Sequence, residues 1–482
     1  MAKRNIKKNY ILNLCYQLLI LITPLITTPY ISRVLGADGI GKVSYAESIV
    51  SYFTLFATLG ITTYGKREIS YVQDSIEKRT HVFWNTKVLE FFTSTCVLLV
   101  YTIFICAHDN RALYVILGLN ILSVFADVTW FFQGMEEFGK IVLRNTFFRI
   151  VNIVYLFVFV RTKDDFLVYA FGLSLFLFLS NISLWVYLPK YITRIRLVNI
   201  HPIKSLSTVI SLFIPTIAIQ VYGVLDKTMI GIITKSSFEN GYYEQASKVS
   251  SIVLTLVTAL GTVMIPRVGY LYEQRQTDEI NRLMYRGYRF VWFLGIPLCL
   301  GLFCVSDNFV PWFFGSSYDR VAILLKILAF TILAVGINNV TGMQYLIPTK
   351  RQNIFTISVI IGACVNFALN SVLIILFQSI GAAIATVVAE TLIAVVQLVF
   401  VRKEISPFKV LKEGIDYYIS GIIMFIVVNP INKALSPSII NTGIMVLVGA
   451  AIYFGTLFIM KDEFFLSNIK AIMDKLIKGG KE

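Results

Sequence analysis

The sequence predicts an all-α protein that crosses a membrane about fourteen times. Of its 482 residues, 56% are apolar and 15% are charged, whereas about a quarter of the residues in a soluble domain are charged. The mean hydropathy is +0.73. Apolar runs of about 20 residues, the length that a helix needs to cross a bilayer, follow one another along the chain.

The apolar runs form two sets of six and a final pair. The first six predicted helices are 10–31, 44–64, 84–106, 113–132, 141–160 and 166–188. The next six are 206–233, 241–265, 288–305, 321–346, 354–377 and 380–401, and the final pair is 417–428 and 442–460. We therefore expect an N-terminal lobe at 1–188, a connector at 189–205, a C-terminal lobe at 206–401, two extra helices within 402–460 and a tail at 461–482.

The basic residues predict the orientation of the chain. It has 43 Lys and Arg against 28 Asp and Glu, a net charge of +15. Most of these cations fall in every second connector, and cytoplasmic loops carry the excess of Lys and Arg. Fourteen helices with both termini in the cytoplasm give this alternation. The positive charge is thus explained without a nucleic-acid partner, because it does not gather on one basic face.

The tail is predicted to lie on the inner membrane surface. Apolar residues recur at helical spacing from Phe464 to Leu476, with lysines between them. This pattern is typical of an amphipathic helix that contacts membrane lipids.

The sequence gives little support to disulfides, metal sites or nucleotide-binding sites. The six cysteines lie within apolar runs without a C-x-x-C pair, and the three histidines lie far apart, so we expect no disulfide, metal site or cofactor. Gly36, Gly41 and Lys42 fit part of a phosphate-binding P-loop, but Val43 stands where the P-loop needs Ser or Thr. Residues 29–45 are instead predicted to form a glycine-rich reverse turn between two membrane helices.

An internal repeat supports two similar halves. Gly41, Ala46 and Ile49 open the second predicted helix, and Gly241, Ala246 and Val249 open the eighth with the same spacing. Gln133-Gly134-Met135 and Thr341-Gly342-Met343 make a second, weaker match. An offset of six helices keeps both halves in one orientation. We therefore expect a pseudo-twofold axis along the membrane normal, with substrate bound between the halves.

Ionisable residues within the spans are the candidate functional residues, because charges inside a membrane are costly and usually face a cavity. Tyr222, Asp226 and Lys227 form a polar strip on the predicted helix 206–233; a fixed ion pair between helices is the alternative. Lys248 could bind substrate or form an intrahelical salt bridge with Glu244. Further candidates, at outer helix ends, are Arg33 and Glu47. For Glu90, Asp127, Lys326 and Glu390 a structural role is expected.

Several motifs together resemble the Wzx-type polysaccharide flippases of the multidrug/oligosaccharidyl-lipid/polysaccharide exporter superfamily. They occur in the order of that family over about three quarters of the chain. The matching segments are Pro29-Tyr30-Ile31-Ser32-Arg33-Val34-Leu35-Gly36; Trp130-Phe131-Phe132-Gln133-Gly134-Met135-Glu136; Tyr222-Gly223-Val224-Leu225-Asp226-Lys227; Gly241-Tyr242-Tyr243; Pro266-Arg267; and Leu346-Ile347-Pro348.

The resemblance implies a non-enzymatic transporter of the bacterial cytoplasmic membrane. It implies two six-helix lobes that open alternately and move an undecaprenyl-pyrophosphate-linked oligosaccharide to the outer leaflet, driven by an H⁺ or Na⁺ gradient or by the membrane potential. Arg33, Lys227, Lys248, Tyr222 and Gln133 are then expected to bind substrate, and Asp226 and Glu47 to couple the ion. A polysaccharide polymerase and a chain-length regulator are expected partners.

Three alternatives stay open. A lipid II exporter would use the same mechanism on another cargo. A multidrug exporter of the same superfamily would need more acidic than basic groups in its cavity, against Arg33, Lys227 and Lys248. A membrane polymerase or glycosyltransferase has only the Asp164-Asp165 pair as a carboxylate dyad in an outer loop. The motifs name no sugar unit and do not separate capsule from O-antigen.

Overall fold

The computed structural model describes residues 6–193, 200–259, 261–468 and 470. Every regular element in these ranges is a helix, and 11 helical segments are long and apolar enough to cross a membrane. The predicted all-α polytopic fold is confirmed. The chain divides into two compact units, Met1–Glu244 and Gln245–Glu482, and each is described here by itself. The predicted lobe limits and the count of fourteen helices stay predictions.

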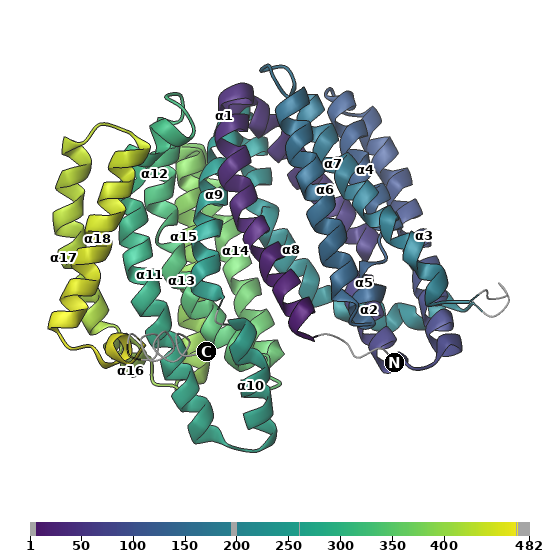
Figure 1. Ribbon diagram of the computed structural model, residues 1–482. Helices are drawn as coiled ribbons and strands as arrows, with labels where there is room; N and C mark the ends of the chain where they lie inside the picture. Colours follow the sequence, from purple (N-terminus) through teal and green to yellow (C-terminus); the bar gives the residue numbers. More distant parts are fainter. Residues whose placement is uncertain (1–5, 194–199, 260, 469, 471–482) are drawn as a thin grey trace. The chain divides into compact units, whose positions relative to one another are not determined.

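The first unit is a helical bundle around α1 (Figure 1). Its elements are α1 (Ile6–Thr58), α2 (Ile61–Tyr71), α3 (Ile76–Cys106), α4 (Arg111–Ala126), α5 (Thr129–Gly134), α6 (Phe138–Phe159), α7 (Phe166–Ser183), the 3₁₀ helices η1 (Leu184–Lys190) and η3 (Pro202–Ser205), α8 (Leu206–Thr234) and the start of α9 (Ser237–Thr258). Buried apolar residues of α1, among them Leu35, Val43 and Val50, pack with residues of α3, α4, α6 and α7. Burial of this stripe fixes α1 within the bundle.

An aromatic cluster packs α5 against α3 and η1 in this unit. Phe83 of α3 packs against Trp130 and Phe131 of α5 and against Trp185 of η1. The three α5 aromatics, Trp130 to Phe132, are fully buried. Such rings bury large apolar areas, which explains how the six-residue helix α5 is held in place.

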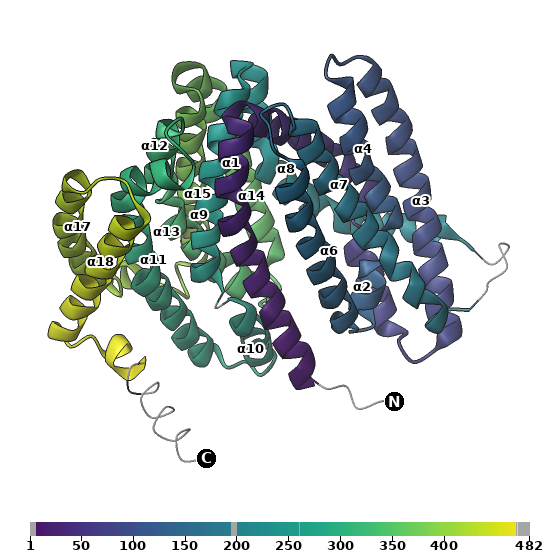
Figure 2. The ribbon, with the colours of Figure 1, turned by 45° about the horizontal axis from the view of Figure 1, so that its top comes forward.

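The second unit contains the remaining helices. They are the rest of α9, α10 (Gly261–Glu273), α11 (Thr277–Phe313), α12 (Asp319–Leu328), α13 (Thr331–Asn338), the π-helix η4 (Asn339–Leu346), α14 (Gln352–Phe377), α15 (Ser379–Val401), α16 (Pro407–Lys412), α17 (Ile415–Ala434) and α18 (Ile439–Ile459). Figure 1 and Figure 2 both show α17 and α18 side by side, and both helices contact α11.

Several predicted boundaries are wrong. The predicted turn at residues 29–45 is a kink: α1 continues through it with helical geometry on both sides of Gly36, where φ is 67° and ψ is 178°. Glycine adopts this left-handed φ readily because it has no Cβ. The predicted helix 113–132 is interrupted at Asp127, whose carboxylate accepts a hydrogen bond from the N–H of Thr129 (2.8 Å) in the turn between α4 and α5.

The connectors predicted in the second unit are mostly helical. The predicted helices 241–265 and 288–305 leave a connector between them, but most of it belongs to α10 and α11, which are separated only by residues 274–276. The predicted span 241–265 is divided between α9 and α10, and 321–346 consists of α12, α13 and η4. The predicted tail helix lies mostly outside the described residues, which show helix at 463–468. The connector 189–205 is described only at its two ends.

Two glycines bring α1 and the start of α9 into close contact. A Cβ on Gly41 would overlap the carbonyl of Ser237, and a Cβ on Gly241 would overlap the carbonyl of Ala37. The Ser237 hydroxyl also donates a hydrogen bond to Asp38. In sequence, Ala37 corresponds to Ser237 and Gly41 to Gly241, so each contact is the counterpart of the other. Reciprocal pairs of this kind are the mark of a twofold contact.

We predict that Gly41→Ala destabilises the protein. The added methyl group has no room beside Ser237, and overpacking of this kind costs about 1–3 kcal/mol. Thermal unfolding in detergent measures the loss. Gly301→Ala is the matched control, because a Cβ there meets nothing within 4 Å; equal unfolding temperatures for the two variants would contradict the close contact.

Candidate functional site

The polar strip predicted on α8 meets the start of α9. The Lys227 ammonium group lies 2.6 Å from the Glu244 carboxylate, with the two side chains 26% and 9% exposed. Ser44 of α1, 200 positions before Glu244, donates a hydrogen bond of 2.9 Å to the same carboxylate oxygen. One acidic group therefore joins three helices of the first unit.

A second acidic contact lies beside this ion pair. The Tyr243 hydroxyl donates a 2.5 Å hydrogen bond to Asp226. Two residues after Asp226 on α8, the Thr228 hydroxyl lies 3.0 Å from the Ser48 hydroxyl and accepts a 3.1 Å hydrogen bond from Tyr52. The predicted strip is thus a network between α1, α8 and α9, and Tyr222 lies one turn before Asp226 on the same helix.

Either charge of the Lys227–Glu244 pair would be costly to bury alone, whereas the two charges together stabilise each other. Removing two charges from water carries a large desolvation penalty, which is repaid only when the partner and additional hydrogen bonds are present. Glu244 has both, in Lys227 and Ser44. Removing either charge would therefore cost the stabilisation that the other receives from it in a low-dielectric region. The arrangement holds Lys227 in place.

A polar hollow of about 420 Å³ lies elsewhere in the first unit, among α1, α3, α4 and α7. Its wall includes the candidate Glu47. The other lining residues are mostly polar: Ser51, Thr54, Thr58, Glu90, Asn120, Ser123, Asp127 and Asn181, with Val50, Val124 and Leu177. Three carboxyl groups and several amide and hydroxyl oxygens in a membrane bundle suit a cation better than an anion.

One acidic residue of this hollow already has a cationic partner. Glu90 lies 2.7 Å from Lys87, and both side chains are almost fully buried. Lys87 also donates to the backbone carbonyl of Asp127 (2.8 Å). The pair is intrahelical, because Lys87 and Glu90 lie three positions apart on α3, where both are buried.

The other candidates lie at other positions on these helices. Arg33 is exposed on α1, three residues before the kink at Gly36. Gln133 lies on α5, which packs mainly on α2 and α6. Lys248, half-buried, follows Glu244 by one turn of α9 and belongs to the second unit.

Two sequence features that suggested other chemistry have local structural roles. Lys42, at the P-loop lysine position, lies 2.7 Å from Asp38 on the same helix. In the loop before α7, the Asp165 carboxylate accepts hydrogen bonds from the N–H groups of Arg161 (2.8 Å) and Thr162 (2.7 Å). These bonds lower the pKa of Asp165, which keeps it ionised as it closes the turn before α7.

Sequence reasoning missed Ser44 and Thr228, and it missed the pairing of Glu244 with Lys227. The repeat gave a signal for Ser44 and Glu244, because positions 44 and 244 correspond in the two halves. The sequence pairs Glu244 with Lys248 by helical spacing, whereas the structure adds Lys227 from α8. Within the described ranges, no group of three or more His, Cys, Asp or Glu side chains could hold a metal ion.

Comparisons with known proteins agree with this architecture. A family model described as polysaccharide biosynthesis protein matches residues 6–272. A putative O-antigen transporter of Escherichia coli K12 is 25% identical over 395 residues, which are 79% of this chain and 93% of the relative. A probable low-salt glycan biosynthesis flippase, Agl15 of Haloferax volcanii, is 25% identical over 208 residues, 43% of this chain and 42% of the relative.

Solved structures share the fold. Lipid II flippase MurJ in an inward closed conformation gives a TM-score of 0.74 at 16% identity, covering 94% of this chain and 99% of that one. An inward-facing multidrug transporter of the MATE family gives 0.61 at 13% identity, covering 81% and 99%. The family model spans more than half of the sequence and includes the α1, α8 and α9 network. The chain therefore belongs to the polysaccharide biosynthesis protein family.

Proposed function

We propose that this protein is a flippase for lipid-linked oligosaccharides. It carries an undecaprenyl-pyrophosphate-linked repeat unit from the inner to the outer leaflet by alternating access, for the synthesis of a surface polysaccharide. Family membership and relatives named O-antigen transporter and glycan biosynthesis flippase support this proposal. The observation that carries it is the Lys227–Glu244 ion pair, a cation held within a membrane-spanning bundle by a single exchangeable acid.

The chemistry of the cargo explains why a cation is needed. A pyrophosphate head and a hydrated glycan cannot enter hydrocarbon without partners for their charges and hydroxyl groups. Lys227 offers three donors to a phosphate. We propose that the phosphate displaces Glu244 from Lys227, after which Glu244 keeps its hydrogen bond from Ser44. Exchange of one anion for another keeps Lys227 neutralised throughout the cycle.

Arg33 and Lys248 are proposed to assist at other stages. The guanidinium group of Arg33 is planar and forked, which suits bidentate contact with phosphate oxygens. Its exposed position beside the Gly36 kink leaves it accessible. Tyr222 and Gln133 are proposed to contact the glycan.

We propose that ion coupling depends on acidic groups distinct from the cation that binds the head. Asp226 accepts a hydrogen bond from Tyr243 and is half-buried, so its protonation or cation binding would alter the contact between α8 and α9. Glu47 lines the polar hollow, where oxygen ligands predominate. An H⁺ or Na⁺ gradient, or the membrane potential, is the proposed energy source.

We further propose that the protein lies in the bacterial cytoplasmic membrane with both termini inside the cell, and that it transports its cargo without catalysing a reaction. A polymerase and a chain-length regulator are its proposed partners. Lipid II export is the second candidate for cargo, because a lipid II flippase of Bacillus subtilis is 24% identical over 326 residues, 58% of this chain and 57% of the relative.

We predict that Arg33→Ala reduces surface polysaccharide at least about tenfold, because a charged hydrogen-bonded contact to phosphate is worth about 1.5–3 kcal/mol. The measurement is polysaccharide on intact cells, normalised to protein inserted in the membrane. Arg111→Ala is the matched control, since Arg111 is also exposed at a helix end. Unchanged export with Arg33→Ala would remove Arg33 from the mechanism.

We predict that Asp226→Asn uncouples transport from the ion gradient. The amide keeps the shape of the carboxyl group but neither ionises nor binds a cation as strongly. Transport by protein in vesicles, measured with and without an imposed H⁺ or Na⁺ gradient, should lose its gradient dependence. Asp319→Asn, at an exposed helix start, is the control. If gradient dependence survives in Asp226→Asn, Asp226 has a purely structural role.

We predict that Lys227→Ala lowers the free energy of unfolding by about 3 kcal/mol, because it removes the cation that lies 2.6 Å from the buried Glu244 carboxylate. The double variant Lys227→Ala/Glu244→Gln should recover most of this loss while still failing to bind a polyprenyl pyrophosphate. Thermal unfolding and ligand-induced stabilisation are the two measurements.

The pair Lys326–Asp307, 2.6 Å apart, is the matched control, because its lysine is as exposed as Lys227 whereas its carboxylate is 50% exposed. Lys326→Ala should cost at most about 1 kcal/mol, as exposed ion pairs do. If Lys227→Ala and Lys326→Ala have equal effects, the Lys227–Glu244 pair is not the tightly balanced contact described here. If the double variant binds the pyrophosphate normally, Lys227 does not bind the head.

A further inference from the structure

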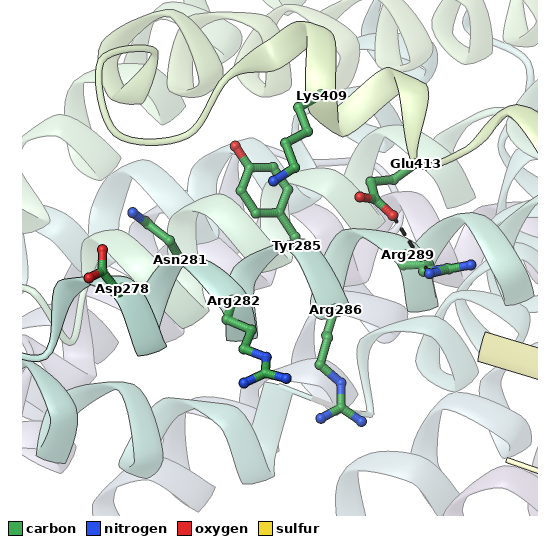
Figure 3. Close-up of a pocket in the computed structure, with 8 residues that line it drawn as sticks. All are labelled: Asp278, Asn281, Arg282, Tyr285, Arg286, Arg289, Lys409 and Glu413. Atoms are coloured by element: carbon green, nitrogen blue, oxygen red, sulfur yellow. Dashed lines mark ion pairs between the residues drawn. The ribbon is translucent and has the colours of Figure 1, made fainter. Parts of the chain in front are cut away.

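A basic hollow of about 360 Å³ lies in the second unit between α11 and α16. Figure 3 shows its lining residues, six from α11 and two that reach toward it from the α16 segment. They are Asp278, Asn281, Arg282, Tyr285, Arg286, Arg289, Lys409 and Glu413. The candidate substrate and ion residues do not include any of them.

The positive charge of this hollow is only partly balanced. Arg289 lies 2.7 Å from Asp462 and 3.9 Å from Glu413. Lys409 rests over the ring of Tyr285, 4.1 Å from its centroid. These contacts fix the position of α16 on α11. Besides Glu413, the wall of the hollow contains the carboxylate of Asp278.

Arg282 and Arg286 carry the positive charges that a bound anion would neutralise. They lie one turn apart on α11, both exposed, and in Figure 3 their guanidinium groups end on the same side of the helix. Within the described part of the chain, neither has an ion pair. Like charges at this spacing destabilise a helix. An anion bound by both would convert this repulsion into attraction.

The α16 segment places the hollow at a membrane surface. It joins two candidate membrane spans, α15 and α17. Phe408 and Leu411 of this short helix are 77% and 53% exposed, whereas Val410 is buried. Exposed apolar side chains beside lysines are typical of a helix at the boundary between headgroups and acyl chains. Lys409 therefore lies at headgroup depth.

The position of the arginines along α11 agrees with this depth. Trp292 of α11 donates a 2.8 Å hydrogen bond to the backbone of Val410 in α16. At about 1.5 Å per residue, Arg286 lies roughly 9 Å and Arg282 roughly 15 Å along the helix from Trp292. A headgroup layer about 5–7 Å thick on each side of the hydrocarbon core puts Arg289 and Arg286 within or next to that layer.

An apolar hollow of about 570 Å³ borders the same two elements. Trp292 lines it from α11, three residues after Arg289 of the basic hollow, and Pro407 and Leu411 line it from α16. The rest of its wall comes from α13, α15 and Tyr418 of α17, and is almost entirely apolar. A charged hollow and an apolar one thus follow each other along α11, in the order of a lipid head and its chains.

We propose that this place binds an anionic glycerophospholipid, whose phosphate is held by Arg282 and Arg286 and whose acyl chain lies against the apolar hollow. The forked guanidinium groups suit bidentate contact with phosphate. A headgroup with two phosphates, as in cardiolipin, matches two arginines one turn apart. Binding would hold α16 against α11 and thereby the start of α17. This site is separate from the proposed cargo site, so it does not depend on the proposed function.

The test uses the full-length protein in detergent with cardiolipin or phosphatidylcholine added. Native mass spectrometry measures the bound lipid, and thermal unfolding measures the stabilisation. We expect cardiolipin to bind and to raise the unfolding temperature, and phosphatidylcholine to do neither. The variant is Arg282→Gln/Arg286→Gln. At about 1 kcal/mol for each basic residue near anionic lipid, its apparent affinity for cardiolipin should fall about thirtyfold.

The matched control is Arg402→Gln/Lys403→Gln, which removes two exposed cations from the connector between α15 and α16, outside the hollow. A fall of less than about threefold is expected there, because non-specific attraction is shared among many surface cations. Equal losses in both double variants would show diffuse attraction and overturn the proposal. So would tighter binding of inorganic pyrophosphate, or of an acidic peptide such as polyglutamate, than of cardiolipin.

Discussion

The close approach of α1 and α9 at Gly41 and Gly241 is the contact on which the candidate site depends. Neither glycine leaves room for a Cβ, so the two backbones lie nearer than side chains would allow. Small residues at helix contacts have this effect in membranes, where packing replaces the hydrophobic effect as the driving force. Because the backbones are this close, the short Ser44 hydroxyl can reach Glu244 one turn deeper.

The reciprocity of this contact gives the sequence repeat a physical meaning. Ala37 meets Gly241, and Gly41 meets Ser237, so glycine is needed at both copies for the same reason. A sequence comparison shows only that two glycines share a spacing. The structure shows that corresponding positions face each other, which explains why both copies carry glycine.

Hydropathy predicted most helices because the hydrocarbon core requires a long apolar run. The same measure failed where helices leave that core, since polar residues 267–289 continue as α10 and α11. It also could not distinguish a loop from a kink at Gly36, or see the break at Asp127. For the site, spacing gave Asp226 and Lys227 on α8. Glu244 and Ser44 as partners required knowing which helices lie alongside.

The two polar regions of the first unit cannot move independently. Ser44, which holds Glu244, and Glu47, which lines the acidic hollow, are three residues apart on α1. One turn of helix is rigid on this scale, and a bend at Gly36 would displace both residues together. A movement of α1 that follows a change in the charge of the hollow would therefore also move Ser44 at the Lys227–Glu244 pair. No chain of contacts between the hollow and the pair is needed for this. In the proposed flippase, this mechanical link would let an ion in the hollow act on the Lys227–Glu244 pair on another face of the same helix.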